Sequence, residues 1–265
     1  MNVSGRDRDG YQVRAVLRAA AILELLRTAE GGASLKELAS RSGLAKASAF
    51  RLLRTLECAG LVERTAGPDI YKLGVRCLAL GQAYLEQTDL RREALPFLER
   101  LREEFDETVH LGVMDGEMRV VYLEKLETRN AVGLMMSRVG KTAPSFCTGV
   151  GKALLSGMSG DPVSTLEEKG VLRRYTPGTI YDPEELREEL SKIRDRGFAL
   201  DMEEHEAGVR CVACPITGPN RTAVAAVSIA GPSHRLPERL LEGELADAVV
   251  VAAREISHRL GSPTA

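Results

Sequence analysis

A glycine-rich stretch, Thr148-Gly149-Val150-Gly151-Lys152, has residue types and a spacing that could bind a phosphate or another anion. A phosphate-binding loop would require a glycine five residues before the last glycine and a hydroxyl after the lysine. Phe146 and Ala153 stand at those positions, so nucleotide binding is not predicted. Glycines where a loop enters a helix still expose unpaired N–H groups that can bind an anion such as a carboxylate. The alternative is a glycine turn that serves only close packing.

Histidine, cysteine and carboxylate side chains in the second half of the chain could bind a metal ion. His205-Glu206 matches the start of a zinc-protease helix, but Val209 stands where the second histidine would be. Cys211 and Cys214 form a single CxxC pair, whose side chains would point to opposite faces of a strand. A composite site can be drawn from Cys147, Asp201, His205 and Cys211. Free cysteines are usually small buried thiols, so no metal site and no cofactor is predicted.

The sequence also has no recognisable nucleophile and base. Its four histidines lie in no nucleophile-elbow motif: His110, His205, His234 and His258. We therefore expect that the protein is not an enzyme. The alternative class is a metabolite-binding or hydrolytic enzyme with an N-terminal protein-interaction domain.

A second group of candidate residues is cationic and lies in the segment AKASAFRLLRTLECAG. Its apolar residues have the spacing of one buried helix face: Ala49, Leu52, Leu53 and Leu56. Burying that face leaves four polar residues outward: Lys46, Ser48, Arg51 and Arg54. Arginine can bond guanine edges in the major groove, while lysine and serine can bind phosphates. The alternative is a solvated basic face on a small helical domain.

The elements around this helix predict a winged helix-turn-helix. A first helix is expected within Tyr11–Ala29, and Ser34-Leu35-Lys36-Glu37 is a capping box that begins a second helix. That helix ends at Ser42-Gly43, and the cationic helix ends at Gly60. Two β-prone runs, Leu61–Thr65 and Ile70–Leu73, flank the turn-forming Ala66–Asp69. They form the predicted wing, in which Lys72 would contact the DNA backbone.

Charge is unevenly distributed along the 265 residues. The formal net charge is -2, but residues 1–75 hold 12 Lys and Arg against 8 Asp and Glu, a net of +4, which leaves -6 for residues 76–265. The basic quarter coincides with the predicted DNA-binding elements. Only 4% of residues are aromatic and there is no Trp, which disfavours a stacking platform for single-stranded nucleic acid.

Cysteine usage and hydropathy indicate the compartment. The five cysteines form an odd, scattered set, which favours reduced thiols in a cytoplasmic protein. The polar start carries no signal peptide, and no window approaches the roughly 18 apolar residues of a membrane span. We therefore expect no membrane partner.

The rest of the chain predicts a second, α+β domain. We expect a disordered tail at 1–10, the winged domain at 11–73, a linker helix at 74–88 and the second domain at 89–265. The second domain is expected to contain four helices. Three are Leu90–Phe105, Thr148–Ser156 and Pro237–Leu260, and the fourth begins at Asp182-Pro183 and ends at Gly197. Its expected strands are Thr108–Met114, Arg119–Leu126, Val132–Val139, Phe198–Asp201, Val209–Ile216 and Thr222–Ala230, with Asp115-Gly116 as a two-residue hairpin turn.

These motifs together resemble the IclR family of bacterial transcriptional regulators over nearly the whole chain. The winged domain matches in SLKELASRSGLAKASAFRLLRTLECAGLVER and YKLG. The second domain is more specific, with APSFCTGVGKALL, GFALDMEEHEAGVRCVACPI and AAVSIAGPSHRL in that order. The resemblance implies a ligand-responsive repressor or activator, a homodimer or homotetramer that binds a pseudo-palindromic double-stranded DNA operator.

The resemblance also implies a GAF- or PAS-like effector-binding domain for a small metabolite. Its pocket would take backbone N–H groups from Gly149 and Val150, and polar side chains from Asp201, Cys211 and Ser228. Its apolar walls would be Val132, Met135, Ala143 and Val209. Ala230 stands where some family members have a second hydroxyl, so the identity and polarity of the ligand stay open. The apolar wall residues are small to medium in size, and they fit either a compact organic acid or a modest aromatic compound.

Overall fold

The computed structural model describes residues 12–65, 69–129 and 135–263. The chain divides into two compact units, with the boundary between Gln87 and Thr88. The predicted tail at 1–10, most of the predicted wing turn and Val132 lie outside the described residues. Among the described residues, no helix has the length and apolar character needed to cross a membrane.

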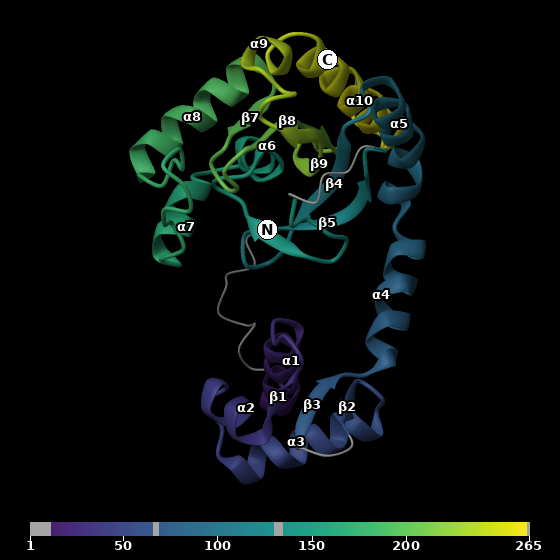
Figure 1. The fold of residues 1–265 in the computed structure, drawn as a ribbon, viewed down its shortest axis with the longest axis vertical. Coiled ribbons are helices and arrows are strands. Elements are labelled where there is room, and N and C mark those ends of the chain that lie inside the picture. The colour runs from purple at the N-terminus through teal and green to yellow at the C-terminus, as the bar shows by residue number, and fades with distance from the viewer. Residues whose placement is uncertain (1–11, 66–68, 130–134, 264–265) are drawn as a thin grey trace, which may run out of the picture. The chain divides into compact units, whose positions relative to one another are not determined.

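The N-terminal unit is a winged helix-turn-helix, as predicted (Figure 1). Its elements are α1 (Arg14–Arg27), β1 (Ala33–Ser34), α2 (Leu35–Arg41), α3 (Lys46–Cys58), β2 (Val62–Arg64), β3 (Ile70–Leu73) and α4 (Val75–Gln87). The strands form an antiparallel sheet in the order β1-β3-β2. The two-residue strand β1 is too short for a sequence pattern to predict. Buried Ile22, Leu38, Leu53 and Tyr71 form the centre of the core.

Local interactions fix the turn that positions α3. Ser34 caps α2 because its hydroxyl accepts the Glu37 N–H at 3.3 Å, while the Glu37 carboxylate accepts the Ser34 N–H at 2.8 Å. Gly43 follows α2 with a φ of +66°, which favours glycine. The tight turn therefore has the residue that its geometry requires, and α3 begins three residues later.

Helix α4 begins in close contact with the winged fold. A Cβ on Gly74 would lie 2.3 Å from the Gly60 carbonyl oxygen, so only glycine permits this approach. The Val75 N–H donates to Glu63 at 3.1 Å, and the Arg76 guanidinium donates to the Ala59 carbonyl at 3.0 Å. None of the residues of α4 is buried within the described structure.

The second unit is an α+β domain, as predicted, around a six-stranded antiparallel sheet (Figure 1). The strands are β4 (Thr108–Met114), β5 (Arg119–Leu126), β6 (Thr142–Pro144), β7 (Ala199–Met202), β8 (Val209–Thr217) and β9 (Ala223–Pro232), in the order β6-β5-β4-β9-β8-β7. The helices are α5 (Asp89–Phe105), α6 (Gly149–Ser156), α7 (Pro162–Glu168), α8 (Pro183–Arg196), α9 (Glu238–Leu241) and α10 (Glu244–Arg259).

Helices α6 and α10 pack on the sheet through different side chains of β8. Cys211 and Ala213 contact the first turn of α6. Cys214, one residue after Ala213, instead lines a cleft with Val250 and Arg254 of α10. Because alternate residues of a strand point to opposite faces, the sheet separates α6 from the α5–α10 layer.

Three expectations for the second unit were wrong. The strand predicted over Val132–Val139 is absent from its described part, because the Met136 and Ser137 carbonyls accept hydrogen bonds from lysine side chains at 2.9 and 3.0 Å. Strand β6 pairs with β5 instead. The expected two-residue hairpin turn is a longer loop, ending at Met118 with a φ of 62°. The closing helix is interrupted before Glu244 and forms α9 and α10.

Candidate functional site

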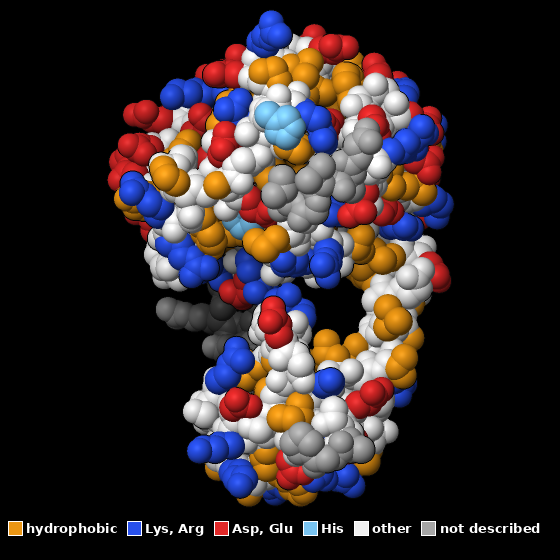
Figure 2. Space-filling view, in the orientation of Figure 1, with side chains coloured by type: hydrophobic (Ala, Val, Ile, Leu, Met, Phe, Trp, Pro, Cys, Tyr) orange, Lys and Arg blue, Asp and Glu red, His pale blue; other side chains and the backbone are white. Residues whose placement is uncertain are grey.

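The first candidate site is the exposed face of α3. Its buried residues are Ala49, Leu53 and Leu56, which agrees with the predicted stripe. Lys46, Arg51 and Arg54 are exposed and Ser48 is half-buried. Figure 2 shows Lys and Arg side chains at the end of the N-terminal unit where α2 and α3 lie. The four polar residues therefore belong to the outer side of one helix.

The cations of this face differ in their interactions. Arg54 donates to the Glu57 carboxylate at 2.7 Å, which neutralises part of its charge. Within the described residues, Arg51 makes no ion pair. Lys72 is exposed on β3 of the wing, opposite Glu63 of β2. Arg51 is therefore the cation whose guanidinium is most available to a ligand.

The second candidate site is a small cavity between α6 and the sheet of the second unit. Its volume is about 40 Å³. Seven predicted residues line it: Met135, Gly149, Val150, Asp201, Val209, Cys211 and Ser228. Ala143 does not line it; it lies instead in a neighbouring cleft of about 480 Å³ with Met118 and Phe146. The fold thus brings together residues that are far apart in the sequence.

Half of the lining residues were not among the residues predicted to bind the effector. They are His110, Tyr122, Ser137, Thr148, His205, Glu206 and Ala230. His110 on β4 is paired in register with Ser228 on β9, and the two side chains approach at 3.4 Å. A prediction that places His110 beside Ser228 requires the pairing of β4 with β9, and no local sequence pattern reveals that pairing.

The first turn of α6 lines this cavity with Gly149 and Val150. The Thr148 hydroxyl caps the helix by accepting the Gly151 N–H at 3.2 Å and donates to the Pro144 carbonyl at 2.7 Å. A Cβ on Gly149 would lie 2.7 Å from the Cys211 sulfur, and one on Gly151 would lie 2.2 Å from the Ser145 carbonyl oxygen. The glycines therefore serve close packing, and Gly149 also lines the cavity at the start of the helix.

Asp201 faces the same cavity from β7. Its carboxylate accepts the Glu204 N–H at 2.8 Å. Burial, together with the nearby Glu204 carboxylate, raises the pKa of Asp201 to about 7. Asp201 is therefore poised to exchange a proton near neutral pH.

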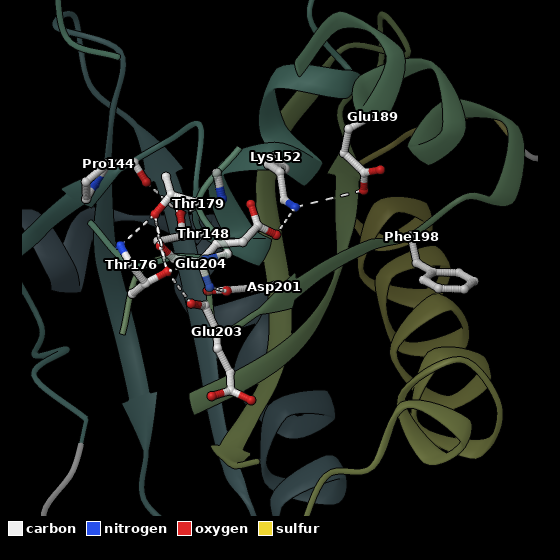
Figure 3. Close-up of polar contacts among 12 residues, drawn as sticks. Pro144, Thr148, Lys152, Thr176, Thr179, Glu189, Phe198, Asp201, Glu203 and Glu204 are labelled. Carbon is white, nitrogen blue, oxygen red and sulfur yellow. Dashed lines mark hydrogen bonds and ion pairs between the residues drawn. The ribbon is translucent and has the colours of Figure 1, made fainter. Parts of the chain in front are cut away.

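The turn after Asp201 is held by buried polar contacts, drawn in Figure 3. The Lys152 ammonium of α6, 1% exposed, donates to the Glu204 carboxylate and lies 3.9 Å from the Glu189 carboxylate. The Thr176 hydroxyl donates to the Glu203 carbonyl and the Thr179 hydroxyl to the Glu204 carbonyl, each at 2.6 Å. This network connects α6 to the turn that carries His205 and Glu206.

His110 and Cys211, two further lining residues of the cavity, are neutral at pH 7. Burial lowers the pKa of His110 to about 3, and its Nε2 lies 2.8 Å from the Ser137 hydroxyl. Burial also raises the pKa of the Cys211 thiol to about 12 and raises that of Cys147. Neither thiol is a ready nucleophile, since thiolates are the reactive form.

The composite metal site also finds no support in the geometry. The described residues contain no group of three or more His, Cys, Asp or Glu side chains arranged to hold a metal ion. Asp201, His205 and Cys211 line the cavity, whereas Cys147 is buried outside its lining. The site has the chemistry of a binding pocket: it combines the start of α6 with the Asp201 and Glu206 carboxyl groups and with the polar side chains of His110 and Ser228.

Comparisons with known proteins identify the family of each unit. Residues 15–66 match the IclR helix-turn-helix domain, and residues 82–258 match the bacterial transcriptional regulator IclR C-terminal domain. The acetate operon repressor of Salmonella typhimurium is 32% identical over 251 residues, which cover 94% of this chain and 91% of the repressor. The relatives compared are regulators and repressors, not enzymes.

Solved structures give the same result. The crystal structure of IclR from Thermotoga maritima is 34% identical, covers 94% of this chain and 100% of its own, and has a TM-score of 0.67. An IclR homologue from Microbacterium hydrocarbonoxydans, complexed with 4-hydroxybenzoate, is 26% identical, covers 93% of this chain and 98% of its own, and has a TM-score of 0.74. This chain therefore belongs to the IclR family of bacterial transcriptional regulators and carries that family's helix-turn-helix DNA-binding domain.

Proposed function

We propose that this protein is a cytoplasmic, ligand-responsive repressor or activator that binds a pseudo-palindromic operator through α3 and the wing. The observation that carries the proposal is the exposed basic face of α3. In this proposal Arg51 and Arg54 contact base edges in the major groove, Lys46 and Ser48 contact phosphates, and Lys72 contacts the backbone from the wing.

The operator would be contacted by two copies of the chain, or by a dimer of dimers. Exposed apolar side chains on α1 and α4 support this part of the proposal: Val13 before α1, Val16 and Leu17 on α1, and Val75, Leu78 and Leu80 on α4. Val75 and Leu78 are 73% and 72% exposed. Apolar surface of this extent is usually covered by a partner, and a second copy would place a second α3 in the next major groove.

The full-length protein tests this proposal with duplexes that it selects from random-sequence DNA. The selected sequence should be a pseudo-palindrome, and the affinity should fall about a hundredfold between 50 and 200 mM salt if the dimer makes about four phosphate contacts. Sedimentation of the complex should give two or four chains per duplex. A flat salt response, or one chain per duplex, would contradict the proposed DNA interface.

For the second unit we propose a small carboxylic acid as effector. The Gly149 and Val150 N–H groups at the start of α6 would bind its carboxylate, and the protonated Asp201 carboxyl would donate to it. The apolar side would be formed by Met135 and Val209. The small cavity favours a compact acid, whereas the 4-hydroxybenzoate bound by the Microbacterium homologue favours an aromatic acid.

The proposed role of Asp201 predicts a pH dependence. Asp201 is protonated below its pKa of about 7 and negatively charged above it, so it would repel an anionic effector at high pH. Affinity for the acid should therefore be greatest below pH 7 and fall towards tenfold per pH unit above it. Calorimetry with acids from acetate to 4-hydroxybenzoate, between pH 6 and pH 8.5, measures this.

The matched control is Asp201→Asn, which keeps the shape and removes the titration. His110, whose pKa is about 3, and Cys211, whose pKa is about 12, do not titrate in this range. The variant should bind the acid with little pH dependence. An unchanged pH profile in Asp201→Asn would exclude Asp201 from the effector site.

A further inference from the structure

One large apolar side chain lies on the cationic helix without a buried role. Phe50 of α3 is 44% exposed. Within the described residues its ring takes part in no aromatic pair and no cation–π contact, and it is not among the residues packed against the core of the unit. The ring therefore contributes little to the fold as it stands.

The neighbours of Phe50 on the helix surface identify the kind of partner that fits it. Residues three and four positions apart are neighbours on a helix, so Phe50 lies beside Lys46, Ala47 and Arg54, all exposed. A helical side chain covers the turn that precedes its own Cα. The ring consequently lies over the turn of Lys46 and Ala47, and the single methyl group of Ala47 leaves room beside it.

This surface is an apolar patch between cations. A polyanion would provide negative charges for Lys46 and Arg54 on the two sides of the ring. An apolar protein surface would bury these cations without counter-charges. In the major groove of duplex DNA, the apolar group that bases present at their edges is the 5-methyl group of thymine. Duplex DNA therefore offers both phosphates that can contact the cations and a methyl group that can contact the ring.

We infer that Phe50 contacts the 5-methyl group of a thymine in each half-site of the operator, and so determines part of the sequence specificity. The inference rests on the proposed function, because it requires α3 to enter the major groove. It adds an apolar contact, specific for thymine, to the contacts proposed for the cations.

The test compares thymine with uracil, which lacks only that methyl group. The duplex selected by the full-length protein is prepared with each thymine in turn replaced by deoxyuridine, symmetrically in both half-sites. At one position the wild-type affinity should fall about fourfold per half-site, the value expected for burying one methyl group. Phe50→Ala should bind the thymine duplex more weakly than wild type does, and should bind the thymine and uracil duplexes equally.

Lys46→Ala is the matched control, because Lys46 is the neighbour of Phe50 proposed to contact phosphate. It should weaken binding while keeping the wild-type ratio between the two duplexes. Equal wild-type affinity for every uracil duplex, or a full ratio retained by Phe50→Ala, would overturn the inference while leaving the proposed function intact. If the wild-type protein selects no sequence at all, the proposed function fails and the inference fails with it.

Discussion

Arg51→Ala is expected to lower the affinity of the full-length protein for its selected duplex by at least about thirtyfold. A bidentate arginine–guanine contact is worth about 1–3 kcal/mol, and a dimer would lose one in each half-site. Arg51 is exposed and makes no ion pair within the described residues. Its truncation should therefore leave the thermal midpoint and the oligomer size unchanged. Fluorescence anisotropy at a fixed salt concentration measures the affinity.

The matched control for this prediction is Arg254→Ala. Arg254 is also exposed but lies on α10 of the second unit, so the variant removes the same charge from the chain without altering α3. It should bind the duplex as the wild type does. Equal losses in the two variants would mean that net charge, not contact by α3, accounts for the effect.

The second large effect is expected on stability. Lys152→Met should destabilise the second unit by about 3–5 kcal/mol, because it leaves the buried Glu204 carboxylate without its counter-charge. One oxygen of that carboxylate, Oε2, already has no hydrogen-bond partner within the described structure. Urea unfolding followed by circular dichroism measures the loss.

Two further variants make this second prediction specific. Lys152→Met combined with Glu204→Gln removes both charges and should recover much of the stability. Lys169→Met breaks a solvent-exposed pair with Glu117 and should cost less than about 1 kcal/mol. A Lys152→Met variant as stable as the Lys169→Met variant would show that the buried pair does not hold α6 to the turn after Asp201.

The buried and exposed sides of α3 could be predicted from the sequence because a helix is a local structure. The spacing of Ala49, Leu53 and Leu56 determines which side of α3 is buried, and the residues left over are then exposed. The glycine turn after α2 and the capping box at Ser34 are equally local. Each is formed by residues within one or two turns of one another.

The second site was less predictable because it depends on contacts between distant segments. Met135 lies in a segment that forms no strand in its described part, where the Met136 and Ser137 carbonyls accept hydrogen bonds from the Lys141 and Lys125 side chains. His110 lines the cavity because the register of β4 with β9 places it opposite Ser228. The family resemblance supplied seven lining residues that periodicity alone could not have brought together.

The tight junction at Gly74 has a mechanical consequence for the winged fold. The backbone contact with Gly60 and the hydrogen bonds of Val75 and Arg76 leave little freedom for bending where α4 begins. The helix has 13 residues and is therefore about 20 Å long. We therefore expect α4 to move with the winged fold as one rigid body. A tilt of α4 at Gln87 would then displace α3 and the wing, by a distance that increases with the length of the helix.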